Sequence, residues 1–172
     1  ITANTAKVTN SSSASDLTSG TLPTARLPSG SVLQVQSTTV VAVASTTNTD
    51  SSSIGGDVGL NVTITPLSST SKFYITADVG IGTCSSGNTW AGVLSRGGAK
   101  VGNGTTVGVR HGALFRSVDH AGNTGTDGNH GVGGSGSYID TTSGTAGTAL
   151  TYKLGICGEG GTSYINRNEG NY

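Results

Sequence analysis

Two stretches in which apolar and polar residues alternate strictly constrain the fold of this chain more than any other feature. Residues 60–65 read LNVTIT and end at Pro66, and residues 73–81 place an apolar side chain at every second position. Residues 150–156 repeat the pattern near the end of the chain. A period of two sends successive side chains to opposite faces of a β-strand. Each stretch therefore predicts a strand with one buried and one exposed face.

The alternation also predicts which side chains fill the core, because a shift of one residue would expose every apolar side chain. In the three alternating stretches, residues 60–65, 73–81 and 150–156, the side chains expected to point inward are Val62, Ile64, Phe73, Ile75, Val79, Leu154 and Ile156. In residues 73–81 the same face also includes Ile81, and Tyr74 falls on the opposite face. The side chains expected to point away from the core are Asn61, Thr63, Asp78 and Lys153.

Shorter candidate strands separated by Gly, Ser and Asn complete the expected fold. They cover residues 32–36, 40–44, 90–94, 113–116, 137–140 and 163–166. About eight or nine strands with turn residues between them are typical of a jelly-roll-like antiparallel β-sandwich, so the predicted class is all-β. Residues 121–136 are rich in glycine and poor in apolar side chains, and we expect them to form a long surface loop rather than a core strand.

The composition narrows the possible partners. Charged residues make up 10% of the chain, well below the roughly 25% usual for soluble domains, and the formal net charge is zero. Nucleic-acid binding requires a concentrated positive surface, which is not expected here. No apolar stretch has the length of a membrane span, so membrane insertion is not expected either. A neutral surface rich in hydroxyl and amide groups suits glycans or protein partners.

Residues 1–30 differ from the rest of the chain and are expected to form an extended segment before a head domain at residues 31–172. They scatter small apolar residues among Ser and Thr and cannot bury a core alone. They are either a flexible linker or a stalk that becomes ordered by wrapping around identical copies. The chain begins at Ile1 without methionine, as expected of a fragment or a processed product.

No motif predicts a catalytic centre, a cofactor or a metal site. Cys84 and Cys157 lack metal-ligand spacing, and buried thiols are favoured over a disulfide between them. The histidines at 111, 120 and 130 are expected in solvent, although one histidine or aspartate facing a threefold axis would supply three ligands to an ion. The carboxylates available to a glycan depolymerase form no recognisable pair; they are Asp78, Asp119, Asp127, Asp140 and Glu159.

Several stretches resemble a known family. Residues 16–35 (DLTSGTLPTARLPSGSVLQV) are similar to the stalk-to-head junction of bacteriophage tail-fibre proteins of the marine and cyanobacterial phage type, and residues 1–10 (ITANTAKVTN) resemble trimeric fibre stalks. Residues 60–79, 94–98 (LSRGG) and 150–167 resemble the head. The resemblance implies a turn at ITP-SSTSK, a hairpin at Arg96-Gly97 and late strands at TYK and INR. Relatives usually continue with another apolar strand, so a further C-terminal piece is expected.

The resemblance implies a homotrimer on the surface of a virion, assembled in the host cytoplasm together with other fibre or tail proteins. Its expected role is non-enzymatic receptor binding for host adsorption, with a host surface glycan or protein as partner. The alternatives are a purely structural virion component, such as a head fibre, capsid decoration or baseplate connector, and a glycan depolymerase. The residues expected to contact the receptor are Asp119, His120, Asn123, Asp127, Asn129 and His130, with Trp90 as an aromatic candidate that could equally pack in the core.

Overall fold

The protein is described by a computed structural model covering residues 26–49, 54–84, 89–105, 112–118, 132–142, 144–158 and 160–167. The chain divides into two units, Ile1–Val35 and Gln36–Tyr172, and only residues 26–35 of the first are among those described. Every strand pair in the described ranges is antiparallel, and these ranges contain no α-helix. No helix there could therefore cross a membrane. The prediction of an all-β fold is confirmed.

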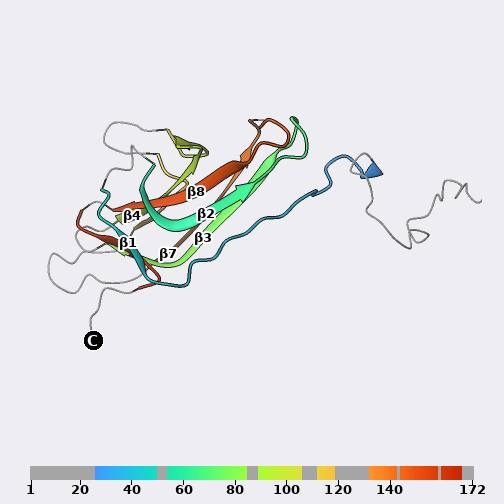
Figure 1. Cartoon of the computed structure of the whole chain (residues 1–172). Coiled ribbons are helices and arrows are strands. Elements are labelled where there is room, and N and C mark those ends of the chain that lie inside the picture. The colour runs from blue at the N-terminus through green and yellow to red at the C-terminus, as the bar shows by residue number, and fades with distance from the viewer. Residues whose placement is uncertain are drawn as a thin grey trace, which may run out of the picture. The chain divides into compact units, whose positions relative to one another are not determined.

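The strands form two sheets (Figure 1). The first sheet has the order β1 (Ala44–Thr46), β9 (Ser163–Ile165), β3 (Phe73–Cys84) and β7 (Val132–Asp140). The second has the order β2 (Gly56–Ile64), β8 (Leu150–Gly158), β4 (Thr89–Arg96) and β5 (Ala99–Lys100), with β6 (Phe115–Val118) also paired to β4. The pairs β1–β9, β2–β8, β3–β7 and β4–β6 are nested along the chain. The described strands thus pair as one long hairpin folded over on itself.

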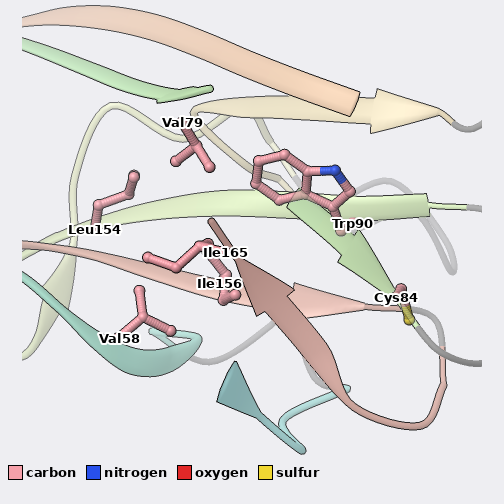
Figure 2. Packing of buried hydrophobic residues seen from close by; sticks show 7 residues of the cluster. All are labelled: Val58, Val79, Cys84, Trp90, Leu154, Ile156 and Ile165. Atoms are coloured by element: carbon pink, nitrogen blue, oxygen red, sulfur yellow. The ribbon is translucent and has the colours of Figure 1, made fainter. Parts of the chain in front are cut away.

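Most of the core lies between the two sheets. Its main cluster takes side chains from β2, β3, β4, β8 and β9, which converge in Figure 2: Val58, Val79, Cys84, Trp90, Leu154, Ile156 and Ile165. A second cluster contains Phe73, Leu94 and Tyr152. These strands belong to both sheets, so the sheets bury their apolar faces against each other.

The predicted core residues occupy these clusters. Phe73, Val79, Leu154 and Ile156 are buried, and Val62, Ile64 and Ile75 pack against the second cluster. Thr63 and Asp78 are exposed as expected. Asn61 and Lys153 are half-buried, but each donates a hydrogen bond to the exposed carboxylate of Asp57.

The expected position of Ile81 in the core is wrong, because β3 contains a β-bulge. Val79 pairs with Gly134 and Gly82 pairs with Val132, so three residues of β3 advance while β7 advances two. An extra residue reverses the side-chain alternation beyond it. Ile81 consequently turns outward and is 40% exposed, and Gly82 is buried in its place.

The expected loop at 121–136 is also wrong at its C-terminal end, because β7 begins at Val132. Glycine serves a packing role in this strand. A Cβ on Gly134 would lie 2.6 Å from the ring of Phe115, and one on Gly136 would lie 2.8 Å from the Leu114 side chain. These glycines let Phe115 and Leu114 approach the strand closely. A glycine count alone could not distinguish such a strand from a loop.

Residues 32–36 and most of 40–44 form no strand, contrary to expectation, and β1 covers only Ala44–Thr46. A side chain holds part of this segment instead of a neighbouring strand. The Asn166 Nδ2 donates to the Val40 carbonyl at 2.6 Å and to the Ala42 carbonyl at 3.0 Å. Asn166 has a positive φ of 59°, a conformation that asparagine tolerates better than most residues.

The turns expected from the family resemblance are confirmed. Residues 65–72 connect β2 to β3. Arg96 pairs with Ala99 across a two-residue turn in which Gly97 and Gly98 both have positive φ. Such a turn matches the twist of an antiparallel hairpin. The TYK residues lie in β8, whereas of the INR residues only Ile165 lies in β9 and Asn166 and Arg167 follow its end.

Candidate functional site

The polar residues predicted to contact a receptor lie outside the described part of the chain. They are Asp119, His120, Asn123, Asp127, Asn129 and His130. The structure describes the residues on either side of them: β6 ends at Val118 and β7 begins at Val132. Residues 119–131 therefore connect a strand of the second sheet to a strand of the first.

Trp90 is a core residue and cannot act as an exposed receptor contact in this conformation. It is 3% exposed, and its ring meets Phe115 edge to face at a centroid distance of 5.6 Å. A Cβ on Gly82 would lie 2.5 Å from the indole, so the ring fills the space that the glycine leaves. The indole Nε1 has no hydrogen-bond partner among the described residues. Packing, the alternative expected for this tryptophan, is confirmed.

A buried polar cluster joins the two sheets at the end of β7. The Asp140 carboxylate is fully buried and lies 2.7 Å from Arg96 Nη1. The Tyr152 hydroxyl donates to the same carboxylate oxygen at 2.9 Å, and the Thr142 amide donates to the other oxygen at 2.8 Å. Arg96 also donates to the Thr142 carbonyl at 2.9 Å. Asp140 is thus paired with a charge and with neutral donors, as a buried carboxylate requires.

Burial raises the pKa of Tyr152, and its hydrogen bond to Asp140 raises it further. The Tyr152 ring also packs against Phe73 at a centroid distance of 5.8 Å. The phenol, the carboxylate and the guanidinium thus satisfy one another at the edge of an apolar cluster. This arrangement supports a structural role for the cluster, linking β7 in one sheet to β4 and β8 in the other.

The raised pKa of Tyr152 predicts a loss of stability at alkaline pH. The ordinary value is 10.0, and the folded chain holds the phenolic proton more tightly than the unfolded chain does. The contribution is complete below that pH and is lost as the pH rises, because only the unfolded tyrosine then ionises readily. Urea unfolding from neutral to strongly alkaline pH should show this decline. Tyr152→Phe should flatten the alkaline decline, and an unchanged profile would contradict the assignment.

The described carboxylates do not form the paired arrangement of a glycosidase. Asp78 is exposed on one face of the first sheet, whereas Asp140 is buried on the other face. Asp57 lies 2.9 Å from Lys153, which lowers the pKa of that carboxyl together with the Gly59 amide. Within the described ranges no three His, Cys, Asp or Glu residues come together as metal ligands. Cys84 and Cys157 are buried thiols, as expected.

An exposed surface that the sequence reasoning missed lies on the outer face of the first sheet. Tyr74 of β3 and Ile139 of β7 are direct cross-strand neighbours and are 70% and 55% exposed. The sequence alternation already places Tyr74 on the polar face of its strand, and an aromatic side chain at such a position was the one sign of this surface in the sequence. The exposure of Ile139 could not be predicted from the sequence. An apolar isoleucine beside a charged aspartate suggests the opposite arrangement, but Asp140 is buried and Ile139 is exposed.

The same outer face carries a second aromatic group on β9. The neighbours of Tyr164 in β9, Ser163 and Ile165, are buried, so Tyr164 points outward. The Arg167 guanidinium lies over its ring at 4.3 Å from the centroid, a cation–π contact.

The chain matches no family model, no curated protein and no solved structure.

Proposed function

We propose that this chain is a homotrimeric virion fibre protein of the bacteriophage type, and that it binds a glycan or a protein on the host cell surface without enzymatic activity. The proposal combines the resemblance of residues 16–35 and 60–79 to tail-fibre sequences with the architecture of the described strands. It places the protein on the exterior of the particle, next to other fibre or tail proteins.

The nested strand pairing is the observation that carries the proposal furthest. Pairs β1–β9, β2–β8, β3–β7 and β4–β6 divide between two sheets in the order expected of an eight-stranded jelly roll, with β5 as an added short strand. Jelly rolls are common in viral capsid proteins and lectins. Fold-level likeness of this kind supports a virion protein or a glycan-binding protein, while the binding itself depends on particular residues.

Contacts before β1 support a head that follows an extended segment. The Asn166 side chain holds the carbonyls of Val40 and Ala42, and its own amide donates to the Ile81 carbonyl at 2.9 Å. Val41 and Val43 in this segment are 85% and 54% exposed. An extended segment that Asn166 fixes to the head suits a chain that enters from a stalk.

A purely structural virion component is the second candidate. The exposed Tyr74–Ile139 pair favours assembly with protein, which a head fibre, a capsid decoration or a baseplate connector would need equally. Binding to host cells separates the two candidates, since only the receptor-binding protein needs it.

Replacing residues 119–131 by a Gly-Ser segment of equal length should abolish binding to host cells. The replacement removes the side chains of Asp119, His120 and Asp127 and the other polar candidates, and it leaves β6 and β7 intact. Single contacts of short polar side chains are weak, so several copies must act together, and cell binding should fall to background when these side chains are lost. Labelled protein bound to host cells is the measurement.

The matched control changes the exposed turn residues Ser69 and Thr70 to glycine, which should leave cell binding unchanged. Both variants should keep the β-type circular dichroism and the oligomeric mass of the parent chain. If the replacement at 119–131 binds cells as well as the parent does, the receptor site lies elsewhere. If the parent itself binds no host cell, the structural candidate is the better one.

A further inference from the structure

We propose that the outer face of the β1–β9–β3–β7 sheet is the surface through which copies of this chain pack against one another. The inference rests on the proposed homotrimer and identifies its interface. The outer face is defined by the exposed side chains of β3 and β7 and by the aromatic group on β9: Tyr74, Thr76, Asp78, Ser135, Ser137, Ile139, Tyr164 and Arg167.

The apolar part of this face is exposed to water in a single copy of the chain. Tyr74 and Ile139 face each other across β3 and β7, so their exposed surfaces are contiguous. Their inner neighbours Phe73 and Asp140 are buried, which fixes both side chains on the outside. Burying such a pair against another surface removes apolar area from water, which favours association. Isoleucine offers no group to the hydroxyls of a glycan, which favours a protein surface as the occupant.

The remainder of the outer face is shaped for close approach. Two rows of small side chains continue from the apolar pair along β3 and β7, where Thr76 pairs with Ser137 and Asp78 pairs with Ser135. Small hydroxyl side chains allow another sheet to come near and can exchange hydrogen bonds with it.

The charges on this face are complementary in a way that identifies a second copy as the occupant. Asp78 on β3 is negative, and Arg167 after β9 is positive. No ion pair joins either side chain to another described residue. Tyr74 and the Tyr164–Arg167 stack are about 30 Å apart along β3, because nine residues separate Tyr74 from the partner of Tyr164, Thr83.

Complementary features at the two ends of one face suit contact with another copy of the chain, either in a twofold pair or in a closed ring. In a ring, one half of the outer face of each copy contacts the other half of the outer face of the next copy. The same contact repeats until the ring closes. The Tyr74–Ile139 end of one copy can then cover the Tyr164–Arg167 end of the next, with Asp78 facing Arg167. A closed ring of three copies agrees with the proposed stalk.

The test introduces a charge on this face and a matched charge elsewhere. Tyr74→Lys combined with Ile139→Lys places ammonium groups in the proposed interface, and Leu67→Lys places one in the β2–β3 turn at a residue that is 56% exposed, close to the 55% of Ile139. Sedimentation at micromolar concentration measures the mass of each. We expect three times 16.9 kDa for the parent chain and for Leu67→Lys, and 16.9 kDa for the double variant. Buried unpaired charge should weaken association by about a hundredfold or more.

Because both side chains are exposed in one copy, the double variant should keep the β-type circular dichroism of the parent. The milder pair Tyr74→Ser and Ile139→Ser should also shift the mass toward the monomer. A trimeric parent whose mass survives both pairs of changes would overturn the assignment of this face and leave the fibre proposal standing. A monomeric parent would overturn both. A trimer that falls apart as expected but fails to bind host cells would support the interface and contradict receptor binding.

Discussion

Asp140→Ala should lower the free energy of unfolding by about 3 to 5 kcal/mol, because it breaks a buried ion pair and leaves its partners unsatisfied. Asp140 is fully buried, and its carboxylate accepts from Arg96 at 2.7 Å and from Tyr152 at 2.9 Å. Without the carboxylate, the buried Tyr152 hydroxyl loses its acceptor and the Thr142 amide loses another. Urea unfolding with linear extrapolation measures the change. Chain concentrations must be equal, because the stability of the proposed trimer would depend on concentration.

Two milder variants separate the charge from the hydrogen bonds. Asp140→Asn keeps an oxygen for the Tyr152 hydroxyl and removes the charge opposite Arg96, so we expect a smaller loss than for alanine. Tyr152→Phe removes one hydrogen bond to a charged group, a loss of about 1.5 to 3 kcal/mol. A loss below about 1 kcal/mol for Asp140→Ala would mean that Arg96, which is 20% exposed, turns to solvent and that the cluster does not join the sheets.

The strands with regular alternation were predictable from the sequence, and those with special geometry were not. Residues 60–64 and 73–79 follow the period of two, and their apolar side chains reach the core as expected. The bulge before Gly82 reverses that period without any change in the local pattern of residue types. The first half of β7 has glycines where Phe115 and Leu114 pack, and only the packing reveals it as a strand. Local propensity cannot report contacts between distant segments.

The candidate site was less predictable than the fold. Polar loop residues such as His120 and Asp127 were chosen for what they could bind, and they lie outside the described residues. The outer face follows from pairing between β3 and β7, which brings Tyr74 beside Ile139 although 65 positions separate them. A single tyrosine at a polar position is an ordinary feature of a strand. It becomes informative only when its cross-strand neighbour is also apolar and exposed.

Trp90→Ala should cost about 3 to 5 kcal/mol of stability, because the largest side chain of the main cluster would leave a cavity between the sheets. The indole fills space bounded by Phe115 and Gly82, and it is 3% exposed. Ile81→Ala is the matched control in β3 of the other sheet. Sequence alternation alone places Ile81 in the core, but the bulge turns it outward. We expect that control to change stability by less than about 0.5 kcal/mol.

A double-mutant cycle tests whether the bulge and the indole depend on each other. Gly82→Ala alone should cost about 1 to 3 kcal/mol, because its Cβ would lie 2.5 Å from the Trp90 ring and the core would be overpacked. In the Trp90→Ala background the added methyl group enters the cavity, so its cost should disappear. An equal cost in both backgrounds would show that Gly82 does not face Trp90. A large loss of stability for Ile81→Ala would show that Ile81 is buried and that β3 contains no bulge. Together these unfolding measurements determine whether the lack of a side chain at position 82 provides the space that the Trp90 ring occupies.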